Sequence, residues 1–135
     1  EMRCTQRWLD LREPEEDVGA IILQQPEGEK LGYFSVRAAT DAALTMREVA
    51  VVGYPADQQN GMKQFASSGT ISRVNSKFVR YSVDTFQGQS GAPVFTVTRN
   101  VAEAVAIHAY EDSSLKLNVG VRLTEDWIEL IKSWL

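Results

Sequence analysis

Apolar runs separated by turn residues make up most of this chain and predict strands. Between residues 47 and 123, six such runs follow one another at spacings of roughly 8–15 residues. Turn residues lie between them, including the pair Asn60-Gly61, which tight turns favour. The pattern predicts an all-β fold, an antiparallel barrel or sandwich. The six runs are REVAVVGYP, MKQFASSGTISRV, KFVRYSVD, GAPVFTVT, EAVAIHAY and LKLNVGVRL.

The first third of the chain contains one further apolar run. Residues Asp17 to Pro26, DVGAIILQQP, predict a buried strand that ends at a proline, and PEGEKLG predicts the turn after it. The small and polar stretch Ser35 to Met46 has the composition of a linker. The chain therefore divides into an early strand region and a later block of strands.

The final segment, TEDWIELIKSWL, changes to helical periodicity. Thr124 precedes two acidic residues, as expected at the start of a helix, and apolar residues then recur on one face. We expect this face to pack on the barrel. The polar face is mainly acidic, which disfavours binding to a membrane surface. The apolar residues are Trp127, Ile128, Ile131, Trp134 and Leu135.

Composition and charge narrow the possible functions. With 135 residues, 44% of them hydrophobic, the chain can bury one core. Its 14 Lys and Arg against 18 Asp and Glu give a net charge of -4, without a basic stripe, so we expect no nucleic-acid partner. No apolar run approaches the ~20 residues of a membrane span, and the first residues lack the order of a signal peptide. We expect a soluble chain whose targeting segment, if any, has been removed or lies outside it.

Cysteine and histidine are scarce. The single cysteine, Cys4, excludes an internal disulfide and a zinc site made of several thiolates. One histidine without clustered ligands predicts neither a metal nor a cofactor. Cys4 by itself is best interpreted as a small, partly buried thiol.

The stretch DTFQGQSGAPVF, Asp84 to Phe95, is the strongest candidate for chemistry. A serine hydroxyl becomes a useful nucleophile only if a base takes its proton and donors stabilise the oxyanion. Glycine at position 88 gives the backbone freedom to point the amides of Gly88 and Ser90 into one concavity. Taken alone, the motif would favour an ordinary glycine-rich hairpin turn, so its context must decide. It matches neither the G-x-S-x-G elbow nor a phosphate loop.

The order of motifs around this turn resembles a known family. GQSGAPVF is followed by a hairpin, then AIHAY, NVGVRLT and a terminal helix. This order resembles the second half of the chymotrypsin-like serine proteases, most closely the glutamyl endopeptidase branch. The resemblance extends over most of the chain and is strongest from Val49 to Leu123. It implies a chymotrypsin-like antiparallel β-barrel with a C-terminal α-helix, preceded by the last strands of a first barrel.

The resemblance also implies roles for individual residues. Ser90 corresponds to the nucleophile, and the amides of Gly88 and Ser90 to the oxyanion hole. Asp17, at the start of DVGAIIL, corresponds to the aspartate that orients the catalytic imidazole. From its surroundings alone, PEEDV, Asp17 would be one of several solvated acids.

Two further residues correspond to the substrate pocket of the glutamyl branch. Thr85 lies five residues before Ser90, and His108 lies in the AIH segment. A hydroxyl and a neutral imidazole can donate hydrogen bonds to a carboxylate, so the resemblance implies cleavage after Glu. On spacing alone, His108 would instead be a core histidine bonded to backbone.

The catalytic histidine of the family has no counterpart here. It should lie well upstream of Asp17, whereas the only histidine, His108, follows Ser90. Three explanations are open: a second processed chain carries it, the sequence is a fragment, or the chain is a noncatalytic relative. We favour the first, because a half-barrel alone would expose strand edges and apolar faces.

The expected organisation is residues 1–45 as the end of the first barrel and a linker, 46–123 as the second barrel, and 124–135 as the helix. The expected function is a secreted serine endopeptidase that acts on peptides or proteins, needs no cofactor and is inactive without the histidine-bearing segment or chain. Cys4 would suit an intermolecular bridge to that segment. The alternatives are a noncatalytic peptide-binding module and a chymotrypsin-like protease without acidic preference.

Overall fold

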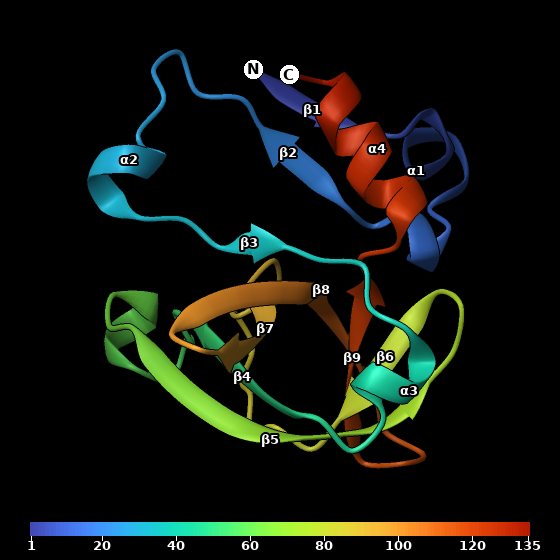
Figure 1. Cartoon of the computed structure of the whole chain (residues 1–135). Coiled ribbons are helices and arrows are strands. Elements are labelled where there is room, and N and C mark those ends of the chain that lie inside the picture. Colours follow the sequence, from blue (N-terminus) through green and yellow to red (C-terminus); the bar gives the residue numbers. More distant parts are fainter.

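Six strands close into an antiparallel barrel in the computed structural model, which describes residues 1–135 (Figure 1). Around the barrel the order is β4-β5-β6-β9-β8-β7, and β7 pairs again with β4. The predicted all-β barrel with a C-terminal helix is therefore confirmed. The strands are β4 (Glu48–Gly53), β5 (Phe65–Val74), β6 (Phe78–Tyr81), β7 (Pro93–Thr98), β8 (Val101–Asp112) and β9 (Leu117–Arg122).

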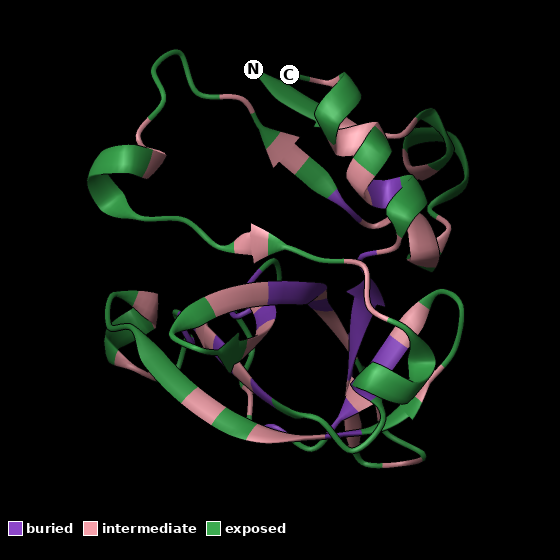
Figure 2. Ribbon diagram, in the orientation of Figure 1, coloured by how far each residue is buried: buried purple, intermediate pink, exposed green.

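Alternation of side chains places the core inside this barrel. Along β4, Val49 and Val51 are buried while Glu48 is exposed, as the two-residue period of a strand requires. Figure 2 shows buried residues concentrated in the barrel strands. The interior cluster comprises Leu44, Val49, Val51, Ile71, Val79, Tyr81, Val83, Ala92, Val94, Val105 and Ala106.

The turns predicted from the sequence join these strands. Arg99 and Asn100 have φ values of 51° and 64°, the left-handed pair that a two-residue hairpin between β7 and β8 needs. The β5–β6 hairpin is held by Asn75, whose Oδ1 accepts from the amides of Lys77 at 2.9 Å and Phe78 at 2.7 Å. The pair Asn60-Gly61 forms the end of a short 3-10 helix, η2 (Gln59–Gly61), with Asn60 at φ 55°.

Strand β8 is irregular, and its irregularity determines which way its residues face. Its register against β9 shifts between His108 and Tyr110, so that Ala109 is an extra residue. Such a bulge changes the face on which the following side chains lie. Accordingly, His108 bonds to Tyr81 of the interior cluster, whereas Tyr110 packs against a second apolar cluster outside the barrel. This outer cluster comprises Val18, Ala104, Val121, Leu123 and Trp127.

The first part of the chain contains short elements, most of which lie against one side of the barrel, whereas the segment Asp41–Leu44 contacts β5 (Figure 1). The predicted strand from Asp17 to Pro26 is shorter than expected, because only Gly19–Ile21 pairs with a neighbour, β1. The predicted linker contains β3, which pairs with β8 in parallel, and Leu44, which is buried in the barrel core. The elements are β1 (Met2–Cys4), α1 (Gln6–Leu11), η1 (Pro14–Glu16), β2 (Gly19–Ile21), α2 (Gly28–Leu31), β3 (Ser35–Val36) and α3 (Asp41–Leu44).

Helix α4 (Glu125–Ser133) covers the outside of the barrel, as predicted. Thr124 caps it by accepting from the amide of Trp127, and Glu125 and Asp126 occupy its first turn. Trp127 packs with Val18 of the first part and with residues of β8 and β9, so the helix lies where the two parts meet. No helix in the structure has the length and apolar character needed to cross a membrane.

Arg122, at the end of β9, anchors the chain between the two parts. Its side chain is buried and donates to Asp41 Oδ1 at 2.6 Å, to the carbonyl of Ala39 at 2.6 Å and to that of Asn75 at 2.8 Å. Asp41 itself is largely exposed, with a side chain 69% accessible. The carbonyl contacts therefore matter more than the ion pair, because solvent screens the charge of Asp41.

This asymmetry predicts the stability of two variants. Arg122→Ala leaves two carbonyls without a donor and leaves a buried space empty. It should therefore lower the free energy of unfolding by about 2–3 kcal/mol. Asp41→Ala should cost only about 0–1 kcal/mol, because it removes an exposed ion pair. Urea unfolding of both variants measures the difference. Equal losses would show that the ion pair, not the carbonyl contacts, holds the linker.

Candidate active site

The loop between β6 and β7 carries Ser90 in a tight turn. The turn reverses through two glycines with positive φ, Gly88 at 101° and Gly91 at 87°. Gln89 is buried and holds the turn closed. Its backbone amide donates to the carbonyl of Phe86 at 3.3 Å, and its side-chain Oε1 accepts from the backbone amide of Phe86 at 2.8 Å. Ser90 is thereby left exposed at the tip, where a substrate can reach its hydroxyl.

Two backbone amides in this turn have no acceptor within the protein. The amides of Gln89 and Gly91 donate to protein carbonyls, whereas those of Gly88 and Ser90 make no hydrogen bond. A cavity of about 280 Å³ adjoins them. Unpaired donors beside a nucleophile are what stabilisation of an oxyanion requires. The lining residues are Val52, Gly53, Tyr54, Gly88, Gln89, Ser90, Gly91 and Ala92.

Strand β8 holds the other side of the turn through the backbone of His108. The His108 carbonyl accepts from Gly91 at 2.8 Å, and the His108 amide donates to the Ala92 carbonyl at 2.9 Å. The His108 ring lies inside, 6% exposed, with Nδ1 2.6 Å from the Tyr81 hydroxyl oxygen. Burial lowers the pKa of His108, which keeps the imidazole neutral at pH 7.

Thr85 lies in the same loop but borders a different cavity, of about 330 Å³. His108 is not among the residues that line it, so the two predicted pocket residues do not share one cavity in this structure. Asp57 and Asp84 also line this cavity. A carboxylate bound beside Thr85 would therefore need a further donor to offset these two charges.

Asp17 lies at the end of η1 and is connected to the site through β8. The Tyr110 hydroxyl donates to Asp17 Oδ2 at 2.6 Å, while Oδ1 makes no hydrogen bond. Burial, and then the hydrogen bond and negative charge of Asp17, raise the pKa of Tyr110 well above its usual range. No hydrogen bond joins Asp17 to the nucleophile turn. The structure thus places Asp17 next to Tyr110, two residues after His108 on β8, and leaves Asp17 Oδ1 without a partner in the protein.

Three residues of this site were not predicted from the sequence: Tyr81, Gln89 and Tyr110. Tyr81 and His108 are 27 residues apart, and Asp17 and Tyr110 are 93 apart. The sequence carries no signal for either pair, because no local spacing connects residues this far apart and aromatic residues are common in strands whatever their hydroxyl binds. Gln89 was the one residue of the three that lies inside the recognised motif.

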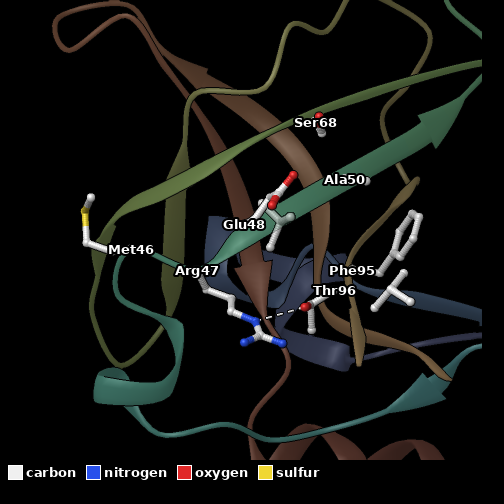
Figure 3. A pocket seen from close by; sticks show the side chains of 9 residues that line it. Met46, Arg47, Glu48, Ala50, Ser68, Phe95 and Thr96 are labelled. Atoms are coloured by element: carbon white, nitrogen blue, oxygen red, sulfur yellow. Dashed lines mark hydrogen bonds between the residues drawn. The ribbon is translucent and has the colours of Figure 1, made fainter. Parts of the chain in front are cut away.

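A cavity of about 500 Å³ lies elsewhere, where β4 and β7 separate (Figure 3). These strands pair only through Ala50 with Phe95 and Val51 with Val94. Beyond that point Arg47 crosses the gap and donates to Thr96 Oγ1 at 3.0 Å and to Thr98 Oγ1 at 2.6 Å. None of the predicted site residues lines this cavity.

No group of three or more His, Cys, Asp or Glu side chains is placed to hold a metal ion. Cys4 is a free thiol, partly exposed in β1. The residues of interest for chemistry are those of the Ser90 turn and its neighbours on β8.

Comparison with known proteins finds relatives among the peptidases. A family model described as a trypsin-like peptidase domain matches residues 5–106. The glutamyl endopeptidase of Bacillus licheniformis is 33% identical over 126 residues, which is 87% of this chain and 39% of that protein. An extracellular metalloprotease of Bacillus subtilis is 28% identical over 128 residues, 94% of this chain and 40% of that protein. The chain spans about two-fifths of the length of these relatives.

Solved structures show the same fold. The structure of a Glu endopeptidase in complex with MPD matches with a TM-score of 0.85 and 26% identity, over 98% of this chain and 61% of that one. Tobacco etch virus protease complexed with product matches with a TM-score of 0.54 and 16% identity, over 75% of this chain and 42% of that one. At that identity the second match shows the fold alone.

The two glycines of the Ser90 turn provide a matched test of its geometry. A Cβ at Gly88 would lie 2.9 Å from the Tyr54 carbonyl oxygen and 3.2 Å from the Ala56 amide nitrogen, whereas a Cβ at Gly91 would meet nothing within 4 Å. Both have positive φ, so alanine is strained at either position, by roughly 1–3 kcal/mol.

Gly88→Ala should therefore lower the free energy of unfolding by at least about 1 kcal/mol more than Gly91→Ala, because it adds a backbone clash to the same strain. Urea unfolding of the two variants measures this difference. Equal destabilisation would mean that position 88 does not lie close enough to the backbone of residues 54–56 for a Cβ to clash with it.

Proposed function

The chain belongs to the trypsin-like peptidase family, and on this premise we propose that it is the nucleophile-bearing part of a serine endopeptidase. Ser90 is the proposed nucleophile, Gly88 and Ser90 form the proposed oxyanion hole, and Asp17 is the proposed triad carboxylate. The observation that carries the proposal is the pair of unpaired amides beside an exposed serine, in a turn with a chymotrypsin-like fold around it.

The proposed reaction needs a base that this sequence does not contain upstream of Asp17. A histidine from a segment or chain outside the printed sequence takes the Ser90 proton as Oγ attacks the scissile carbonyl carbon. The electron pair of the C=O bond moves to its oxygen, which accepts from the amides of Gly88 and Ser90. The histidine returns the proton to the leaving amine as the C–N bond breaks, and water then hydrolyses the acyl-enzyme. Asp17 Oδ1, which is free of partners, accepts from the imidazole and orients it.

The early part of the chain offers a surface for that segment. We propose that residues 1–45 complete a first barrel with it, and that 46–123 form the second barrel. Strands β1 and β2 pair only with each other, and exposed apolar residues lie on and after β2, Ile21 at 71% and Leu23 at 62%. A two-stranded ribbon with open edges and exposed apolar residues is stabilised by further strands. A histidine-bearing partner of this kind would bring its base to Asp17.

We further propose cleavage of peptides or proteins after Glu, by a secreted enzyme. Two relatives in the comparisons are named for Glu, and a third is named extracellular. In this chain Thr85 and the neutral His108, which do not line a common cavity in this structure, are the proposed hydrogen-bond donors to the carboxylate of a bound substrate. The backbone of His108 pairs directly with the residues after Ser90, which brings this strand beside the reacting bond.

Serine-directed labelling tests the nucleophile. A fluorophosphonate should label Ser90 when the histidine-bearing segment is present and leave it unlabelled in this chain alone, because activation needs a base. Ser90→Ala should lower turnover by about a millionfold while leaving the urea midpoint nearly unchanged, since the side chain is exposed. Mass spectrometry of the labelled peptide and a peptidase assay provide the measurements. Turnover that survives in Ser90→Ala would remove Ser90 from the mechanism.

Substrate choice is tested separately with peptides that differ only at the cleaved residue. Wild-type enzyme should cleave after Glu, more weakly after Asp, and both His108→Ala and Thr85→Val should lower kcat/KM for Glu peptides by about tenfold or more, because each removes a donor to the carboxylate. The urea midpoint of each variant reports its folding. Cleavage mainly after Lys, Arg or large apolar residues would overturn the acidic preference and leave the serine-protease proposal intact.

A further inference from the structure

Tyr81 and His108 form a buried pair whose hydrogen bonding can be assigned in full. The Tyr81 side chain is 0% exposed, and its hydroxyl oxygen lies 2.6 Å from His108 Nδ1. Two arrangements are possible: the phenol donates to Nδ1, or Nδ1–H donates to the phenol oxygen. They place the imidazole proton on different nitrogens.

The surroundings of the Tyr81 hydroxyl distinguish the two arrangements. Its only hydrogen-bond partner in the protein is His108 Nδ1. If Nδ1–H were the donor, the buried phenol proton would have no acceptor, at the cost of an unsatisfied polar group. Burial also raises the pKa of Tyr81 well above its usual range, so the phenol keeps its proton and can donate it. The phenol is therefore the donor.

The other ring nitrogen is left free in this arrangement. His108 Nε2 makes no hydrogen bond, and it is not among the side-chain atoms that are both sealed from solvent and without a hydrogen bond. The backbone of His108 is already held by Gly91 and Ala92. Every group of His108 but Nε2 thus has a partner within the chain.

We infer that Tyr81 is a positioning residue that holds His108 in its neutral Nε2–H form and so presents one N–H donor to an acidic side chain of the substrate. This inference rests on the proposed function for the identity of the substrate. The alternative tautomer would present a lone pair at Nε2, which repels a carboxylate and accepts from the amide of Gln instead. Tyr81 therefore favours the tautomer that can donate to a carboxylate over the one that can only accept from the amide of Gln.

The tautomer can be observed directly, because the chain has a single histidine. In ¹⁵N-histidine-labelled wild-type chain at neutral pH, NMR should show Nε2 protonated and Nδ1 unprotonated. Tyr81→Phe should lose this single state, since nothing else donates to Nδ1. A wild-type ring protonated on Nδ1 overturns the inference, and this result does not depend on whether Tyr81→Phe folds.

A kinetic measurement tests the use of that donor. With the histidine-bearing segment present, the ratio of kcat/KM for paired Glu and Gln peptides should fall by about tenfold in Tyr81→Phe, as expected for one misdirected hydrogen bond. The matched control is Tyr33→Phe, because Tyr33 is exposed and far from His108 in sequence; its ratio should stay at the wild-type value. An unchanged ratio in a folded Tyr81→Phe variant overturns the inference.

The two measurements separate failure of the inference from failure of the proposed function. A wild-type enzyme without any preference for Glu over Gln would overturn the proposed substrate and the role given to Nε2, while the NMR spectrum would still decide the tautomer. An Nδ1-protonated ring in an enzyme that prefers Glu would overturn the inference alone.

Discussion

The two backbone hydrogen bonds between His108 and the residues that follow Ser90 are the constraint on which the candidate site depends. They attach the nucleophile turn to β8, a strand that is itself paired on both sides within a closed barrel. A loop held in this way has little freedom to rotate its amides, so the donors of Gly88 and Ser90 remain beside the cavity without a ligand. Donors that need no reorganisation at the moment of reaction are the most effective at stabilising an oxyanion.

The bulge at Ala109 extends the role of β8 to both sides of the barrel wall. In a regular strand His108 and Tyr110 would face the same way. The extra residue lets His108 face Tyr81 inside the barrel while Tyr110 reaches Asp17 outside it. One strand therefore carries the proposed substrate donor, His108, and contacts both the nucleophile turn and the proposed triad carboxylate. Bulges next to functional sites commonly redirect side chains in this manner.

The junction between the two parts of the chain relies on packing more than on charge. Val18, Trp127 and Leu123 belong to a cluster outside the barrel. Arg122 joins the carbonyl of Ala39 in the connecting stretch to that of Asn75 in the β5–β6 hairpin. Asp17 directly precedes Val18, so the packing of Val18 also positions the carboxylate. Helix α4 contributes Trp127 to this cluster and so supports the site from a distance.

The sequence by itself determined the barrel, its hairpins and the terminal helix, because these depend on local periodicity, turn residues and caps that are printed along the chain. It also determined the family and the motif around Ser90, whose residues are consecutive. It did not determine the short strands within residues 1–45, because their bounds depend on which segments pair with one another in the folded chain. Only the tertiary structure decided that the amides of Gly88 and Ser90 are unpaired and that Tyr81 and Tyr110 bind His108 and Asp17. These contacts join residues far apart in the chain across a bulged strand, and no local pattern encodes the direction in which a side chain leaves a bulge.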